Sequence, residues 1–118
     1  MSQRDASSFL PLKPDVFEVL LALEPGDQHG YAILKAIEGR GVGLAASLLY
    51  RKLKRLMEEG LVEESRRVRR ANDDARRRYY RLTPLGLDVV RAEARRIMVL
   101  ARNGEVRRLA ASARSDNA

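Results

Sequence analysis

The segment that most constrains the fold of this chain is residues 44–60, in which apolar and basic side chains recur with the period of an α-helix. At about 100° per residue, three leucines and a methionine fall within about 100° of one another and form a stripe that must face a core. The stripe consists of Leu49, Leu53, Leu56 and Met57, and the opposite face of Ser47, Arg51, Lys54, Arg55 and Glu58, with Leu48 and Tyr50 at its edges. A monomer gains little from crowding basic side chains on one face, so this face is expected to contact a negatively charged partner.

The positive charge of the chain is concentrated near this helix. The net charge is +7 over 118 residues; residues 51–81 hold twelve basic side chains against six acidic ones, and residues 1–50 hold four against six. Such a local excess is typical of a surface that contacts a polyanion, although charge alone does not identify the polyanion. The alternative interpretation is a solvated face with ion pairs, such as Arg55 with Glu59.

Length and composition exclude several classes of protein. A chain of 118 residues that is 45% hydrophobic and 33% charged is expected to form one globular domain. No apolar run approaches the ~20 residues of a membrane span, so we expect a soluble cytoplasmic protein without membrane contact. Because cysteine is absent and His29 is the only histidine, we predict no metal site and no cofactor. The sequence contains no catalytic arrangement of side chains, so an enzyme is not expected.

Two further helices are predicted before the amphipathic one. Residues 1–10 are polar and small and are expected to form a flexible tail. Pro14 suits the first turn of a helix that is apolar nearly all round, and "EPGDQHG" ends it. A second helix is predicted from about Gly30 to the glycines at 39, 41 and 43. The amphipathic helix follows from about Leu44 to Glu59, and Gly60 ends it.

Beyond Gly60 the pattern indicates a β-hairpin. The segments "LVEESRRVRR" and "RRRYYRLT" are extended candidates on either side of "ANDDA", whose Asn and Asp residues suit a turn. Side chains alternate along a strand, so Tyr80 is expected in the core and Tyr79 outside. Thr83 is predicted to cap a last helix that runs to about Arg102, and residues 104–118 are helical or frayed.

These elements predict a mainly α (α+β) fold, a winged helix-turn-helix with three N-terminal helices, a two-stranded β-wing and a long C-terminal helix. The DNA-binding domain would span residues 11–83 and the C-terminal helix residues 84–103. That helix has only a narrow polar arc, and the rest of its circumference is largely apolar. The excess of apolar surface implies a second copy of the chain, although a helix wrapped within one subunit is the alternative. The predicted dimerisation residues are Leu85, Val89, Val90, Ile97, Leu100 and Ala101.

Three stretches resemble the signature segments of the PadR family of bacterial winged-helix repressors: "HGYAILKAIE", "LLYRKLKRLMEEGLVEE" and "RRRYYRLTPLG". The resemblance covers about residues 12–103, and the short C-terminal part is similar to the smaller subfamily, which has a single C-terminal dimerisation helix. It implies a homodimer that binds an operator, with Tyr50 beside the DNA backbone and Tyr31 at the start of the second helix. The chain departs from the family pattern at Leu48, where Ser or Thr is usual, and in its wing, which lacks Gly and Pro.

Together, the residues and the resemblance predict a sequence-specific regulator, a repressor that binds double-stranded DNA at a near-palindromic operator as a homodimer. The predicted DNA-binding residues are Tyr31, Ser47, Tyr50, Arg51, Lys54, Arg55, Arg69, Arg70, Arg76, Arg77 and Arg78. A small-molecule effector is left open. The alternative function is that of a winged-helix adaptor, which would bind RNA or an acidic protein through the same basic surface.

Overall fold

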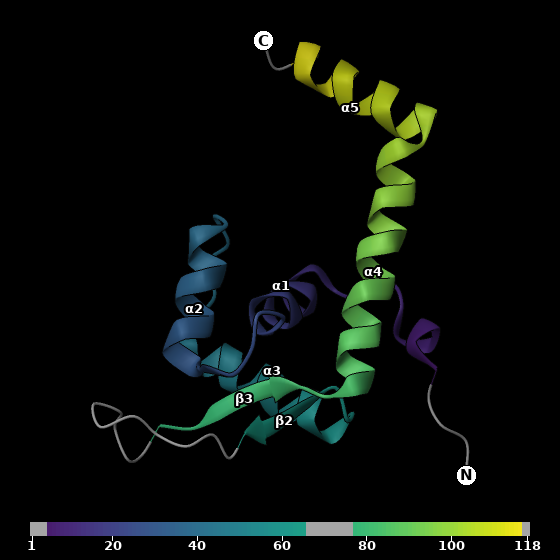
Figure 1. The fold of residues 1–118 in the computed structure, drawn as a ribbon. Coiled ribbons are helices and arrows are strands. Elements are labelled where there is room, and N and C mark those ends of the chain that lie inside the picture. The colour runs from purple at the N-terminus through teal and green to yellow at the C-terminus, as the bar shows by residue number, and fades with distance from the viewer. Residues whose placement is uncertain (1–4, 66–76, 117–118) are drawn as a thin grey trace.

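Helices surround a small sheet, and a helical arm extends from it, in the computed structural model of this protein, which describes residues 5–65 and 77–116 (Figure 1). The elements in chain order are the 3-10 helix η1 (Ala6–Phe9), α1 (Pro14–Leu23), β1 (Gln28–His29), α2 (Gly30–Gly39), α3 (Ala46–Glu58), β2 (Val62–Ser65), β3 (Tyr79–Leu82), α4 (Pro84–Arg102) and α5 (Gly104–Asp116). This arrangement confirms the predicted winged helix-turn-helix. The predicted turn at residues 71–75 lies outside the described residues.

The core forms where α1, α2 and α3 bury their apolar faces against one another and against α4. The leucine stripe predicted on α3 is buried, with Leu49, Leu53 and Leu56 each no more than 2% exposed, and Met57 packs at its edge. Helix α3 begins two residues later than predicted, because Ala45 is extended and acts as the N-cap. Gly60 follows the helix with a φ of +79°, a conformation that glycine adopts without strain.

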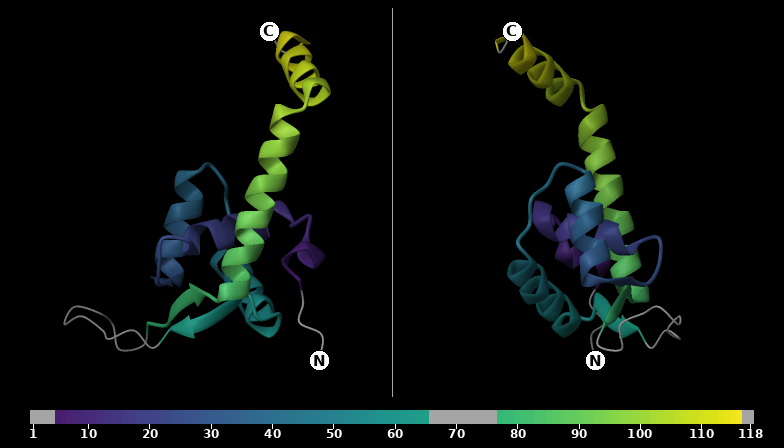
Figure 2. Two further views of the ribbon diagram at one scale, coloured as in Figure 1. Left: turned by 45° about the vertical axis from the view of Figure 1, so that its right-hand side comes forward. Right: turned by 90° about the vertical axis from the view of Figure 1, so that its left-hand side faces the viewer.

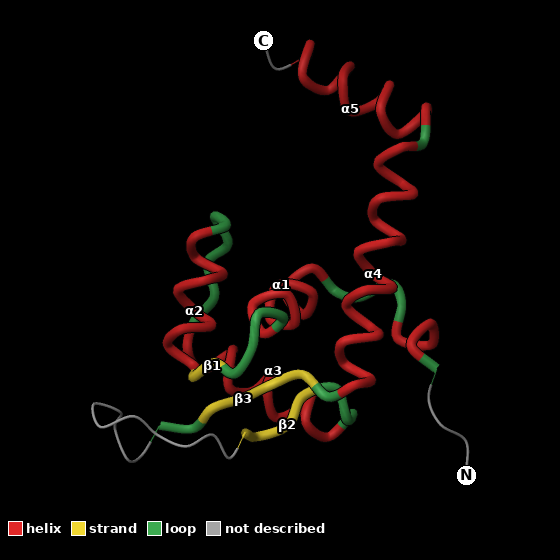
Figure 3. The backbone as a smooth tube through the Cα atoms, in the orientation of Figure 1, coloured by secondary structure: helices red, strands yellow, loops and turns green. Residues whose placement is uncertain are grey.

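The sheet contains one strand more than predicted. Its order is β1-β3-β2, with both pairs antiparallel (Figure 3). Gln28 and His29, predicted as part of a loop, pair with Tyr80 and Tyr79. Tyr80 is buried as expected, but the prediction that Tyr79 is exposed is wrong. Its ring is covered because the ring of His29 packs edge-on against it, with centroids 5.5 Å apart.

Helix α4 begins where predicted and is joined closely to the end of α3. The Thr83 hydroxyl accepts a hydrogen bond from the N–H of Gly86 (3.0 Å) and donates one to the carbonyl of Gly60 (2.6 Å). A Cβ atom on Gly86 would collide with the carbonyl of Leu61, so this position requires glycine. The sequence "LTPLG" therefore docks the long helix on the loop that leaves α3.

The N-terminal segment packs on α4 instead of forming the expected tail. Helix η1 lies beside α4, and Phe9 and Leu10 pack against the core. The buried carboxylate of Glu93 on α4 accepts a hydrogen bond from the N–H of Leu12 (2.9 Å) and pairs with Arg96, whose Nε lies 2.5 Å from Oε1. Sequence reasoning missed Glu93. The Arg96 guanidinium lowers the pKa of Glu93 below its ordinary value, although burial alone would raise it.

The second half of α4 and all of α5 extend away from the rest of the molecule (Figures 1 and 2). Residues 104–116 are helical, which settles the alternative between helix and frayed tail for this segment. Asn103 separates the two helices, and its side-chain oxygen accepts hydrogen bonds from the N–H groups of Glu105 and Val106. Among the described residues, no helix is both long enough and apolar enough to span a membrane.

We predict that Glu93→Gln lowers the free energy of unfolding by about 1–2 kcal/mol at pH 7, because a charge-assisted pair is replaced by a weaker neutral hydrogen bond. The folded-state pKa of Glu93 is depressed, so its contribution is present above the unfolded-state pKa and is lost as pH falls through the folded-state pKa. The difference between variant and wild type should therefore shrink on acidification.

Urea denaturation at pH 7 and at pH 4 measures this difference. The exposed Glu24→Gln is the control and should match wild type within about 0.5 kcal/mol. If Glu93→Gln also matches wild type at pH 7, the carboxylate does not hold the N-terminal segment on α4.

Candidate nucleic-acid interface

The face of α3 opposite its buried leucines is open to solvent. We call this surface the recognition face; it consists of Ser47, Tyr50, Arg51, Lys54 and Arg55, all of which are exposed. Within the described part of the chain, neither Arg51 nor Lys54 has an acidic partner. Arg55 has one, but its Nε is 3.8 Å from the Glu59 carboxylate and its side chain is 79% exposed. A pair this long and exposed contributes little, so the face keeps most of its positive charge.

The fourth basic residue of this helix has a different role. Lys52 is turned toward α1, where its Nζ lies 2.6 Å from the Asp15 carboxylate and its side chain is only 17% exposed. The hydrogen bond from Lys52 lowers the pKa of Asp15. The cluster of basic residues at positions 51–55 therefore divides into three outward charges and one that fastens α3 to α1.

The base of the predicted wing carries exposed arginines on β3 and just before it. Arg78 and Arg81 face acidic residues of β2, with Arg78 Nε 3.9 Å from Glu64 and Arg81 Nε 3.1 Å from Glu63. These pairs agree with the alternative interpretation that some wing arginines are neutralised within the chain. Arg77 is exposed and lies next to His29. Arg69, Arg70 and Arg76 lie outside the described residues.

A pocket of about 290 Å³ joins the recognition face to the base of the wing. Its lining comes from the start of α2, from α3 and from β3 with the residues before it, and we call it the His29 pocket. The lining residues are His29, Gly30, Tyr31, Tyr50, Arg77, Arg78 and Tyr80. The fold thus brings four of the predicted DNA-binding residues together: Tyr31, Tyr50, Arg77 and Arg78.

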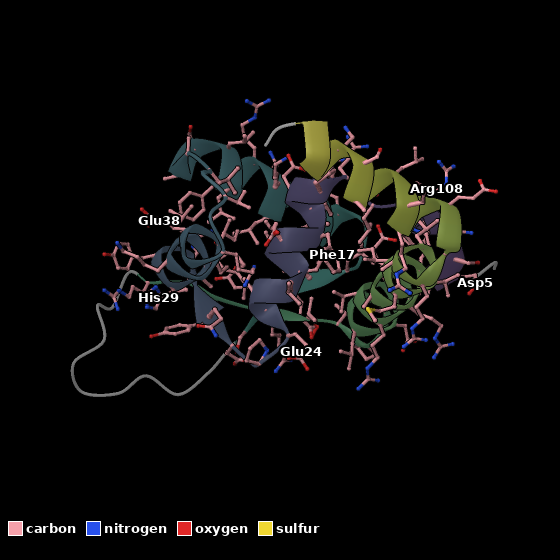
Figure 4. The ribbon with its side chains drawn as sticks, turned by 90° about the horizontal axis from the view of Figure 1, so that it is seen from above. Asp5, Phe17, Glu24, His29, Glu38 and Arg108 are labelled. Atoms are coloured by element: carbon pink, nitrogen blue, oxygen red, sulfur yellow. The ribbon has the colours of Figure 1, made fainter. Side chains whose placement is uncertain are left out.

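His29 organises this pocket, and sequence reasoning missed it. Its Nδ1 accepts a hydrogen bond from the N–H of Ala32 (3.2 Å), which caps α2. Its ring stacks on that of Tyr31 with centroids 6.4 Å apart, and Tyr31 also lies under the ammonium of Lys35. Figure 4 shows His29 on the opposite side of the molecule from Arg108 of α5. The only signal in the sequence was its place directly before the first residue of a predicted helix.

Gly30 allows Tyr50 to lie against the start of α2. A Cβ atom built on Gly30 would collide with the hydroxyl and Cζ atoms of Tyr50. The "HGY" segment and the "LLY" segment are therefore complementary in shape. The absence of a side chain at Gly30 holds the aromatic ring of α3 in the pocket.

Leu48, at the edge of the recognition face, borders a wider groove on the other flank of α3. This groove has a volume of about 740 Å³ and is lined partly by the N-terminal segment, including Phe9, Leu12 and Lys13. Leu48 is 36% exposed there. Among the described residues, no group of three or more His, Cys, Asp or Glu side chains is placed to hold a metal ion.

The chain matches a family model described as the Transcriptional regulator PadR-like family over residues 19–92. A structure of RosR from H. salinarum in a complex is similar, with 26% identity and a TM-score of 0.67, covering 96% of each chain. A PadR family transcription regulator from Clostridium difficile has 25% identity and a TM-score of 0.64, covering 74% of this chain and 90% of the other.

Bacillus subtilis PadR in complex with operator DNA shares the fold, with a TM-score of 0.58 and 22% identity, covering 68% of this chain and 46% of that longer one. No functionally curated protein matches the sequence.

We predict that Gly30→Ala destabilises the protein by about 1 kcal/mol in the wild-type background, because the new methyl group displaces Tyr50. In a Tyr50→Ala background the same change should be neutral or stabilising by up to about 1 kcal/mol, since alanine is the better helix former. Urea denaturation of the four proteins measures this reversal of sign. Equal effects of Gly30→Ala in both backgrounds would contradict the proposed contact.

Proposed function

The chain belongs to the PadR-like family of transcriptional regulators, and we propose that it represses transcription by binding double-stranded DNA at a near-palindromic operator as a homodimer. The observation that carries this proposal is the continuity of the recognition face with the His29 pocket. Together they form a surface with few acidic partners, placed between a helix and the base of a wing. A polyanion that is wide enough to contact both elements fits this surface.

The recognition face suits the major groove. Ser47, Arg51 and Lys54 lie in the first nine residues of α3, whereas Glu58 lies at its C-terminal end. A helix that is basic early and acidic late can enter the groove with its N-terminal half while its acidic end stays away from the phosphates. Arginine and lysine recognise guanine through its O6 and N7 atoms, so Arg51 and Lys54 are the candidates for base contacts.

The base of the wing suits the DNA backbone. Arg77 and Arg78 are exposed beside Tyr50, which the family resemblance associates with the backbone. Contacts to phosphates give affinity for any sequence and position the reading helix. The structure of B. subtilis PadR with operator DNA supports this arrangement at the level of the fold.

A homodimer is proposed through the C-terminal arm. Leu85, Val89 and Val90, predicted at the interface, are packed in the core of their own chain, so they are not available to a partner. The arm beyond them exposes large apolar side chains that a monomer would leave in water. We define the dimer surface by these residues and Ala101: Ile97, Met98, Val99, Leu100, Ala101, Val106 and Leu109.

We predict that Arg51→Ala and Lys54→Ala each weaken operator binding by about 1–3 kcal/mol and relax the preference at one base pair. The operator can be selected from random duplexes, and affinities measured by fluorescence anisotropy at fixed salt. Arg91→Ala, which removes one exposed charge from α4, is the control and should bind as wild type.

Binding of RNA or a scrambled duplex as tightly as the selected duplex would favour the adaptor alternative. Unchanged operator affinity in folded Arg51→Ala and Lys54→Ala proteins would remove the recognition face from the proposal.

We predict that Ile97→Asp or Leu100→Asp produces monomers with most of the specific affinity lost, because a carboxylate is costly to bury in an apolar interface. Each subunit supplies half of the contacts to a two-fold site whose half-sites lie about 10 bp apart. Light scattering at micromolar concentration gives the oligomeric state. Arg95→Asp, on the opposite side of α4, should leave a dimer. A wild-type protein that is monomeric and still binds its operator tightly would overturn the proposed dimer.

A further inference from the structure

His29 receives two hydrogen-bond donors but can accept only one of them. The N–H of Ala32 lies 3.2 Å from Nδ1, and the Nη1 of Arg77 lies 3.3 Å from Nε2. A neutral imidazole has one N–H and one acceptor nitrogen, whereas a guanidinium has only donors. One of the two contacts therefore places a donor against a donor.

The cap of α2 decides which contact this is. The backbone N–H of Ala32 is part of the first turn of a helix and keeps its position, whereas Arg77 is an exposed and flexible side chain. If Nδ1 accepts from Ala32, the ring proton lies on Nε2. The N–H of His29 and the guanidinium of Arg77 then point into the same space, and both require an acceptor there.

The surroundings of this space select an anion. The His29 pocket is lined by two arginines, three tyrosines, a histidine and a glycine, and its lining contains no carboxylate. The carboxylate nearest to Arg78 along the chain of printed pairs is that of Glu64, at 3.9 Å, and Glu64 does not line the pocket. A tetrahedral oxyanion placed between His29 and Arg77 would accept from both donors and could reach the tyrosine hydroxyls.

We propose that the His29 pocket binds one phosphodiester group of the DNA backbone, with His29 Nε2–H and Arg77 donating to the same phosphate. This inference rests on the proposed function, because the pocket lies between the recognition face and the wing base. His29 is then both the cap of α2 and a phosphate ligand. Since a phosphate contact is independent of sequence, it positions α3 without selecting bases.

The two roles of His29 can be separated by substitution. Asparagine is a favoured N-cap residue and its oxygen can replace Nδ1, but it does not extend to the position of Nε2. His29→Asn should therefore keep the stability of wild type in urea and bind both operator and scrambled duplex about 3–10-fold more weakly. His29→Ala should lose stability as well as affinity. If His29→Asn is stable and binds duplexes as wild type does, the histidine is only a cap and the proposal is wrong.

A double-mutant cycle tests whether one phosphate is shared. Arg77→Ala should weaken binding to all duplexes and make the log–log salt slope shallower by roughly 0.9. In the Arg77→Ala background, His29→Asn should cost clearly less than it does alone. Additive losses would mean two separate contacts and would overturn the shared site. Arg81→Ala, on the same strand but paired with Glu63 outside the pocket, is the control and should retain the wild-type slope within error.

A measurement without DNA separates this inference from the proposed function. His29 is the only histidine of the chain, so its ring signals in an NMR spectrum are assigned without ambiguity. Inorganic phosphate should shift them saturably in wild type and not in Arg77→Ala, with sodium chloride at equal ionic strength as the reference. A wild-type protein that binds no duplex but shows this shift would contradict the proposed function alone. Equal shifts with phosphate and chloride would overturn the pocket.

Discussion

The rotation of α3 about its axis is set by the burial of Leu49, Leu53 and Leu56 against the other helices. Removing any one of these from the core would cost about 2–5 kcal/mol, whereas no single exposed charge of the helix contributes as much. The core therefore determines which side chains point outward. Arg51 and Lys54 face solvent because the leucines between them cannot, and Lys52 faces Asp15 because it lies beside the buried stripe. The surface that we propose for DNA is thus a consequence of packing.

Strand β3 connects this helix to the rest of the surface. It is the central strand, so its two neighbours bring together segments that are distant in the sequence. Through β1 it places His29 beside Tyr79, and through the junction at Thr83 it starts α4 against the end of α3. The helix start, the wing base and the recognition face therefore share one rigid support. A shift of β3 would move all three at once.

Elements with their own start and stop signals could be predicted from the sequence. The outward face of α3, the cap at Thr83 and the end of α4 at Arg102 all follow from local residue types, and the structure has them. The resemblance also located Tyr31 and Tyr50, which the fold brings into one pocket. What the sequence could not provide depends on contacts between distant segments. A strand of two residues has no periodicity, so β1 was missed, and with it the burial of Tyr79.

Burial by distant segments also explains the errors on α4. Periodicity shows that the helix is apolar on most sides but not which side its own domain covers, so Val89 and Val90 were assigned to a partner instead of the core. Glu93 looked like one more solvent-facing acid, because the N-terminal segment that covers it begins more than eighty positions earlier. The division of the basic cluster into Lys52 and its outward neighbours likewise required the position of Asp15 on another helix.

The hydrogen bond between Leu12 and Glu93 joins residues 81 positions apart. During synthesis the N-terminal segment leaves the ribosome first, but its carboxylate acceptor emerges only after α4 has been made. Residues 5–13 must therefore wait undocked while α1, α2, α3 and the sheet are completed. Closing so distant a contact is a late and entropically costly step in folding. The last part of the domain to fold is accordingly the first part to be translated.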